Sequence, residues 1–188
     1  MATFLALLLL LGAMFGGAVA LDGWRARRLR AWAQLRGLGT VDARTDGGRL
    51  LAHARRFSRR VRSFGLAFHQ ATAADELWVA EHRATITTRP AERWFTLVVV
   101  HVPGAALPAM VAGPDDAAAA DQAHPAFARW PHGGEIAVDG DFVCWRSQGL
   151  LWPWSVETTL SRGRELVALV TPDLVVTDRA GVEGLPLR

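Results

Sequence analysis

The hydrophobic pattern opens on a long apolar run at the start of the chain. Residues 2–21 contain no charged side chain, and five consecutive leucines occupy residues 7–11. At about 1.5 Å per residue, a helix of this length spans roughly 30 Å, the thickness of the hydrocarbon core of a bilayer. The pattern predicts a transmembrane anchor over residues 1–21.

A helical period continues beyond this run, now with many basic residues. The segment from Trp24 to Arg36 is composed of good helix formers, and glycines follow it at residues 37 and 39. Farther on, apolar residues recur at intervals of 4, 3, 4 and 3: Leu50, Ala54, Phe57, Val61 and Phe64. This spacing predicts an amphipathic helix over residues 49–62. We therefore expect a basic juxtamembrane helical segment over residues 22–64.

Alternation with a period of two replaces the helical pattern after Gly65. Strands are expected at residues 77–88, 94–102, 109–112, 135–138 and 142–146. The turn Asp139-Gly140-Asp141 predicts a hairpin, and Ser155 is expected to cap a final helix over residues 156–170. Residues 65–188 are predicted to form a cytoplasmic α+β domain. The fold class is α+β: a transmembrane helix, basic amphipathic helices, then a mostly antiparallel sheet with a C-terminal helix.

The charge distribution indicates an orientation. The net charge of +3 combines +9 over residues 22–62 with −6 over residues 63–188, and no Arg or Lys precedes the apolar run. Positive residues beside a membrane helix stay in the cytoplasm. The chain is predicted to be a single-pass protein of the cell membrane, with its N-terminus outside and its C-terminal domain cytoplasmic. The acidic distal region argues against nucleic acid as a partner, although the isoelectric point is 10.7.

A cleaved signal peptide is the rival interpretation of the apolar run. Ala18-Val19-Ala20 offers the small-x-small pattern of a cleavage site. The segment before the run lacks the basic residues of a signal peptide, and the segment after it is densely basic, so the uncleaved anchor is favoured. The lone Cys144 also suits a reducing compartment.

Seven residues are candidates for contact with lipid headgroups or the membrane interface. Trp24 lies where an aromatic belt residue is expected, and juxtamembrane arginines contribute about 1 kcal/mol each near an anionic surface. The arginines in question are Arg25, Arg27, Arg28 and Arg30. A topological signal with incidental lipid contact is favoured for these arginines, because the anchor already holds the chain at the membrane. For the basic residues 49–62, lipid contact and a solvated helix face stay equally open. Trp152 and Trp154 lie in an apolar loop that could enter the membrane interface or a partner groove, or could plug the domain core, which is favoured.

The sequence predicts no catalytic residue, metal site or cofactor. Cys144 lies within a predicted strand, where a packed cysteine is favoured over a nucleophile. The six histidines show no pair at the i, i+4 spacing of a helical metal site. A three-ligand site of Asp121, His124 and His132 is conceivable but has no recognised spacing. Asp115, Asp116 and Asp121 could form a loose cation site, although a solvated loop is favoured. No phosphate-binding or nucleophile-elbow motif occurs in the sequence.

Several short motifs resemble those of a family of uncharacterised single-pass membrane proteins of GC-rich bacteria. The absence of Lys, Asn and Tyr is typical of such a genome. The matching stretches are Arg30-Ala31-Trp32-Ala33, Val102-Pro103, Leu107-Pro108, His124-Pro125, Val138-Asp139-Gly140-Asp141 and Cys144-Trp145. The chain lacks the tyrosine-bearing strand of that family and has residues 84–88 in its place. The resemblance implies the architecture above and no activity.

These patterns lead to a functional hypothesis of a membrane-anchored, non-enzymatic interaction or scaffold module. Its partners would be the membrane with its anionic lipid headgroups, or an unidentified protein. Two alternatives stay open. One is an accessory subunit of a membrane protein complex, with Gly12 and Gly16 as a helix-packing face. The other is a small enzyme that uses Cys144 or a His/Asp cluster.

Overall fold

The structure is a computed structural model that describes residues 2–41, 47–58, 60–71, 76–85, 92–113 and 130–170. It confirms the α+β class, with a long apolar helix at the N-terminus, an antiparallel sheet and a helix after the last described strand. The elements in chain order are α1 (Ala2–Leu35), β1 (Gly39–Thr40), α2 (Gly47–Phe57), β2 (Val61–Ala71), β3 (Glu76–Thr85), β4 (Glu92–His101), β5 (Leu107–Ala112), β6 (Glu135–Gly140), β7 (Phe142–Gln148) and α5 (Val156–Val170).

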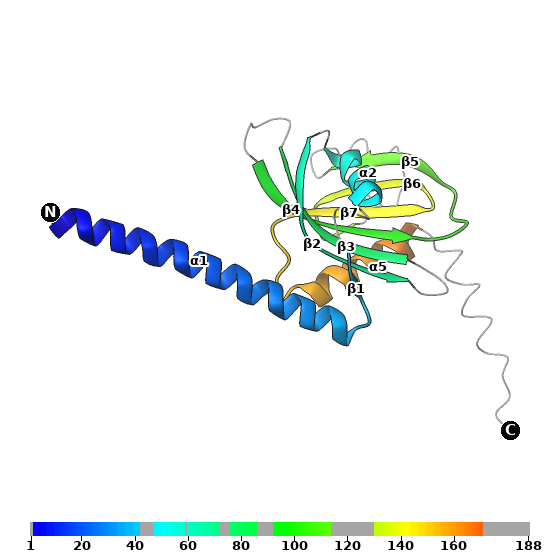
Figure 1. Cartoon of the computed structure of the whole chain (residues 1–188). Helices are drawn as coiled ribbons and strands as arrows, with labels where there is room; N and C mark the ends of the chain where they lie inside the picture. Colours follow the sequence, from blue (N-terminus) through cyan, green and yellow to red (C-terminus); the bar gives the residue numbers. More distant parts are fainter. Residues whose placement is uncertain are drawn as a thin grey trace, which may run out of the picture.

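One seven-stranded sheet organises the domain, in the order β1-β2-β3-β4-β7-β6-β5, and each neighbouring pair is antiparallel (Figure 1). β4 lies at its centre, where Val98, Val99 and Val100 are all buried. A strand that is apolar at consecutive positions must be covered on both faces. The continuous apolar run in the sequence thus marks the middle of the sheet.

The hairpin predicted at Asp139-Gly140-Asp141 is confirmed. Asp139 is paired with Phe142, and Gly140 adopts a φ of 58°, a conformation that costs glycine little. The backbone N–H of Ala106 donates to Oδ1 of Asp141 at 3.0 Å. That bond and those from neighbouring amides lower the pKa of Asp141. Asp139 pairs with Arg56 of α2 at 2.6 Å, so the two carboxylates of this turn bind neighbouring segments of the domain.

The second predicted helix is partly wrong. α2 ends at Phe57, and residues 61–71 form β2, which the sequence prediction missed. The predicted domain boundary between residues 64 and 65 lies inside this strand. Val61 and Phe64 still join Leu50 and Ala54 in one apolar cluster, but from the strand that passes beneath the helix. Register shifts in β2 disturb its alternation, so a helical period accidentally continues across the two elements.

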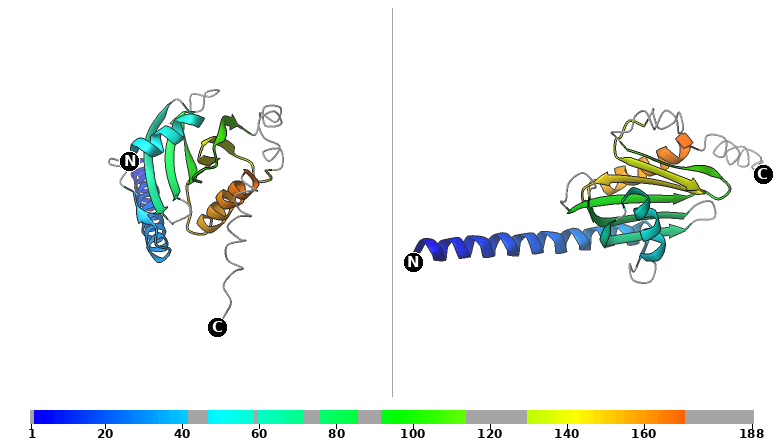
Figure 2. Two further views of the ribbon diagram at one scale, coloured as in Figure 1. Left: turned by 90° about the vertical axis from the view of Figure 1, so that its right-hand side faces the viewer. Right: turned by 90° about the horizontal axis from the view of Figure 1, so that it is seen from above.

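The two faces of the sheet carry separate cores. α5 and the C-terminal part of α1 cover one face, where Leu29, Leu160 and Leu166 pack on β3, β4 and β7. α2 covers the other face through Leu50 and Ala54. Figure 2 shows the sheet between α5 and α2. Side chains alternate between the two cores along β3, β4, β6 and β7, as expected of strands buried on both sides.

α1 continues from an exposed apolar half into the domain. Among the described residues it is the one helix long and apolar enough to cross a membrane, with a mean hydropathy of 2.5 over its most apolar window. Its large apolar side chains up to Leu21 are exposed, whereas Leu29 and Ala33 are buried against the sheet. Figure 1 shows the N-terminal half projecting away from the sheet. The residues after the apolar run therefore belong to the core of the domain.

Candidate functional site

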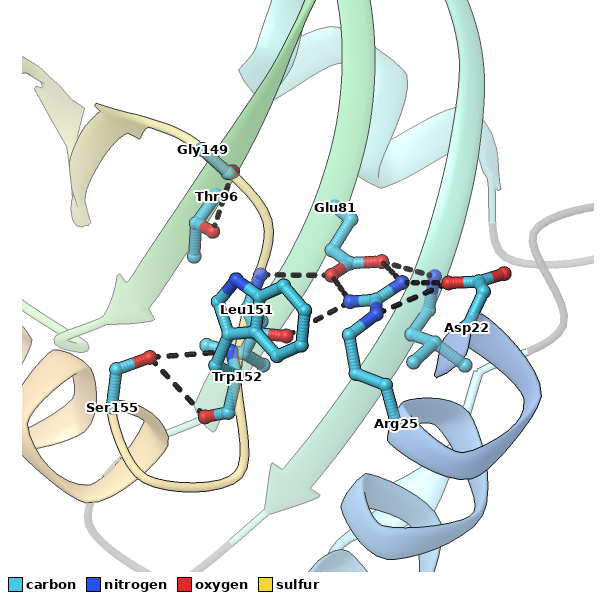
Figure 3. Close-up of polar contacts among 9 residues, drawn as sticks. Asp22, Arg25, Glu81, Thr96, Gly149, Leu151, Trp152 and Ser155 are labelled. Carbon is cyan, nitrogen blue, oxygen red and sulfur yellow. Dashed lines mark hydrogen bonds and ion pairs between the residues drawn. The ribbon is translucent and has the colours of Figure 1, made fainter. Parts of the chain in front are cut away.

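Arg25 occupies the point where α1 first meets the sheet, one helical turn before Leu29. Its side chain is 6% exposed and forms an ion pair with Glu81 of β3. Nη1 also donates to the carbonyl of Leu151 at 2.8 Å, and Nη2 donates to Asp22 Oδ1 at 2.8 Å (Figure 3). The prediction that Arg25 contacts lipid headgroups is therefore wrong, because its guanidinium is enclosed by the protein.

Glu81 receives hydrogen bonds from three segments. The backbone N–H of Leu151 donates to its Oε1 at 2.8 Å, and the N–H of Leu66 donates to its Oε2 at 3.3 Å. Its side chain is 1% exposed, so these bonds and Arg25 provide the compensation that a buried carboxylate needs. A Cβ at Gly65 would lie 2.8 Å from Glu81 Oε2, which explains a glycine there. One carboxylate thus connects α1, β2, β3 and the loop that follows β7.

Burial and hydrogen bonding act in opposite directions on Arg25. Burial alone disfavours the charged guanidinium. The hydrogen bonds to Glu81 and Asp22 outweigh this effect, so the pKa of Arg25 is raised. Arg25 remains charged at every pH at which the protein is folded. The group formed by Asp22, Arg25, Glu81 and the backbone of Leu151 is called the clamp below.

The loop at residues 149–155 leaves β7 and passes alongside α1 at the clamp. Leu151 is buried and fills the core, while Trp152 is half-buried with its ring 5.7 Å from the Arg25 guanidinium. Trp154 stacks on Trp152 at 4.8 Å and stays 69% exposed. The favoured prediction of a core plug thus holds for Leu151. Trp154 instead leaves most of its ring outside the core.

The remaining predicted contact residues lie on the surface of α1. Trp24 is 38% exposed, and Arg28 lies over its ring at 5.9 Å. Arg27 and Arg30 are also exposed. These side chains follow the apolar half of the helix within three turns. Their contact with lipid stays a prediction.

A second group of arginines lies at one end of the sheet. The sequence pattern assigns two of them, Arg60 and Arg62, to a basic helix and gives no sign of the other two. β2 begins, β3 ends and β4 begins at this end, where Val61 is paired with Ala84 and Thr85 with Glu92. We call it the proximal end, and its arginines are Arg60, Arg62, Arg83 and Arg93. Arg62 and Arg83 share Glu92, at 3.3 and 3.1 Å. No sequence signal joins these four, because only the strand register brings them together.

Cys144 is fully buried beneath α2. Its Sγ lies 3.7 Å from His53 Nδ1 and 4.0 Å from Arg56 Nη1, so the structure provides a histidine that is distant in sequence. Burial raises the pKa of Cys144 to about 12, against the opposing effect of Arg56, and burial lowers the pKa of His53 to about 4. A protonated, enclosed thiol beside a neutral imidazole does not make a nucleophile. Its environment is that of a packed cysteine.

His82 and Arg146 form a second buried polar cluster under α2. His82 is fully buried and stacks on Phe95 at 5.5 Å. The Arg146 guanidinium lies over Phe95 at 4.4 Å, pairs with Glu135 and donates to the carbonyl of Phe57 at 3.3 Å. Burial, reinforced by Arg146, lowers the pKa of His82 to about 4. The cation is therefore held by an aromatic and carboxylate cage beside a neutral histidine.

The described residues contain no group of three or more His, Cys, Asp or Glu side chains placed to hold a metal ion. His132 instead pairs with Glu165 at 2.8 Å. The other members of the conceivable cluster, Asp115, Asp116, Asp121 and His124, lie outside the described residues.

No protein-family model, curated protein or solved structure matches this chain. The resemblance to single-pass membrane proteins of GC-rich bacteria stays a prediction. The functional argument therefore rests on the geometry of α1, the clamp and the surfaces beside them.

Proposed function

We propose that this protein is a single-pass, membrane-anchored protein whose cytoplasmic domain is a non-enzymatic interaction or scaffold module. The observation that carries the proposal is the continuity of α1. One helix holds an exposed apolar half of membrane-spanning length and then supplies Leu29 and Ala33 to the domain core. An anchor built in this way sets the orientation of the domain on the membrane, which a flexible tether would not do.

The clamp strengthens this coupling. Arg25 is bonded to β3 through Glu81 and to the following loop through Leu151, so the first turn after the apolar half is fixed to the sheet. α1 also passes without a break through Ala18-Val19-Ala20. Both features support an uncleaved anchor over a signal peptide. The domain would then sit against the bilayer surface with a defined face toward its partner.

The orientation follows from the basic residues that remain exposed. Arg27, Arg28 and Arg30 face solvent just after the apolar half, as a cytoplasmic flank requires. The experiment is a pair of fusions at Arg188, one reporter active only in the cytoplasm and one active only outside the membrane. We expect activity from the cytoplasmic reporter alone. Activity from the external reporter alone would reverse the orientation and overturn this part of the proposal.

The alternative of an accessory subunit is favoured by one observation. Gly12 and Gly16 lie on the exposed half of α1, and a Cβ at either would meet nothing within 4 Å. Such a small-residue face lets a second membrane helix approach closely. Purification from gently solubilised membranes separates the two ideas. A stoichiometric partner lost in Gly12→Leu/Gly16→Leu supports the subunit, whereas a partner retained by that variant supports binding through the domain.

The alternative of a small enzyme receives less support from the structure. Cys144 is enclosed and its pKa is raised to about 12, so it is not a thiolate at physiological pH. A His/Asp cluster would need Asp121 and His124, which lie outside the described residues. The non-enzymatic module is therefore the function that the described geometry favours.

A further inference from the structure

We propose that the domain makes a second contact with the same bilayer. Trp154 enters the interfacial region, and the arginines of the proximal end bind anionic lipid headgroups. This inference rests on the proposed anchor and adds a partner of stated chemistry, a negatively charged lipid surface. The domain would lie on the membrane rather than stand away from it.

The register of the sheet determines which end faces the bilayer. α1 contacts Glu81 through Arg25, and eleven residues later, just after α1 ends, the carbonyl of Arg36 accepts a hydrogen bond from the Gln70 side chain at 3.3 Å. Glu81 is four residues from the proximal end of β3, whereas Gln70 pairs with Leu77 near the opposite end. Followed backwards from Arg25, α1 therefore runs toward the proximal end. Figure 1 shows the apolar half of α1 leaving the domain on the side where β4 begins.

Trp154 lies in the loop between Leu151, which contacts Arg25, and Glu157, which contacts Trp32. The clamp fixes the backbone of Leu151 to Arg25, which is four residues beyond Leu21. Trp152 follows Leu151 directly, and Trp154 stacks on it. Its ring is 69% exposed, although a tryptophan ring is stabilised by leaving water. Tryptophan is enriched at this depth of a bilayer because its ring is apolar and its N–H is polar. The headgroup region of the bilayer around α1 is the environment that fits it.

The charge of the proximal end complements an anionic surface. Four arginines, at residues 60, 62, 83 and 93, face one exposed carboxylate, Glu92, among the described residues of these strand ends. The Arg62 side chain is 57% exposed. The opposite end holds the carboxylates of Glu76, Asp139 and Asp141, of which Asp139 is paired with Arg56 of α2 at 2.6 Å. The charge on the domain is thus polarised along the direction of α1, with the basic end toward the bilayer.

The experiment uses the full chain reconstituted in vesicles of phosphatidylcholine with one quarter phosphatidylglycerol, with lipids brominated near the headgroup as quenchers of tryptophan fluorescence. Trp154→Phe should reduce the fluorescence that the brominated lipids quench by about the contribution of one tryptophan, because the Trp154 ring lies among the lipids. The matched control is Trp130→Phe, whose ring packs against Trp145 away from the clamp. It should leave the quenched amplitude unchanged. Equal amplitudes in wild type and Trp154→Phe would overturn the insertion of Trp154.

The lipid selectivity tests the arginines. Brominated phosphatidylglycerol should quench the protein more than brominated phosphatidylcholine, and Arg60→Gln/Arg62→Gln should reduce that preference by roughly two-fold to five-fold. The control is Arg49→Gln/Arg164→Gln, with the same charge change at exposed positions of α2 and α5. An equal loss in both double variants would overturn the assignment to the proximal end. Alkaline extraction of the vesicles reports on the anchor separately. A protein that stays in the membrane pellet but shows no Trp154 quenching refutes the second contact alone. A protein that is released into the supernatant refutes the anchor.

Discussion

At the residue scale, the Arg25–Glu81 pair is the interaction on which the attachment of α1 depends. Its two side chains are 6% and 1% exposed, so water does not compensate either charge. The pair also holds the backbone of Leu151, and through it the loop that carries Trp154. Removal of one partner leaves an uncompensated charge in the protein, which costs more than the loss of an exposed pair.

Arg25→Met should therefore lower the free energy of unfolding of the full chain in detergent micelles by about 3 kcal/mol or more. The charge of Glu81 would then be buried without a cation. Arg36→Met is the control, because Arg36 and its partner Glu157 are 60% and 52% exposed, and it should cost less than about 1 kcal/mol. In Arg25→Met/Glu81→Leu part of the loss should be recovered. If chemical denaturation shows that Arg25→Met and Arg36→Met lower the free energy of unfolding equally, the clamp does not hold α1 to the sheet.

The two buried histidines under α2 predict a loss of stability in mild acid. Burial lowers the folded-state pKa of His53 and of His82 from 6.5 to about 4. Between these values the unfolded chain binds more protons than the folded protein, so the free energy of unfolding falls as pH decreases from 6.5 toward 4. At pH 5 each histidine should lower the free energy of unfolding by about 2 kcal/mol relative to its value above pH 7.

Thermal melting of the full chain in detergent from pH 7 to pH 4.5 measures this dependence. His53→Gln and His82→Gln should each flatten the pH slope, whatever their stability at pH 7, because glutamine does not titrate. His132→Gln is the control, since that histidine pairs with Glu165 on the surface. A slope that both buried-site variants leave unchanged would show that other groups cause the acid sensitivity.

At the element scale, α1 combines two functions that sequence patterns assign to separate segments. Its exposed half has the composition of a membrane span, and its second half contributes to a soluble core. Leu29→Ala should cost about 2 to 5 kcal/mol of unfolding free energy, because Leu29 is fully buried. Leu35→Ala, on the same helix, should cost less than about 0.5 kcal/mol because Leu35 is 86% exposed. Similar values for the two variants would mean that α1 does not pack on the sheet.

The sequence predicts the elements whose local chemistry is decisive. Asp-Gly at residues 139–140 marks a hairpin, the valines at residues 98–100 mark the central strand, and Ser155 precedes α5 as expected, its carbonyl accepting the Thr159 N–H at 2.9 Å. Its hydroxyl bonds the backbone of Trp152. β2 was missed because Val61 and Phe64 extend a helical period by coincidence. A local pattern cannot show that two elements place their apolar residues in one cluster.

The candidate site was predictable only in part, for a similar reason. Trp24, Arg27, Arg28 and Arg30 are exposed where the sequence places them, whereas Arg25 belongs to the clamp. Its partner Glu81 is 56 residues away along the chain, and that pairing depends on which face of β3 meets α1. The contact of His53 with Cys144 depends on how α2 packs on the sheet, and the gathering of arginines at the proximal end depends on sheet register. Spacing in the sequence carries no signal for them.

At the scale of the whole molecule, the net charge of +3 conceals a polarised arrangement. The basic residues of α1 and of the proximal end lie toward the apolar helix, while the β6–β7 turn with its two aspartates lies at the opposite end of the sheet. Such a distribution orients a domain on a negatively charged surface. The apolar helix, the clamp and the charge polarity all favour the same arrangement on a membrane.

The most direct test of the anchored domain is the depth of spin labels in reconstituted bilayers. Single cysteines replace Leu10, Arg28 and Ala71 in the full chain, and the buried Cys144, whose pKa is raised to about 12, should remain unlabelled. We expect the label at residue 10 to be accessible to oxygen and shielded from an aqueous nickel chelate. The label at residue 28 should lie at the headgroups, and the label at residue 71 should be fully accessible to the chelate. Equal chelate accessibility at residues 10 and 71 would contradict the account.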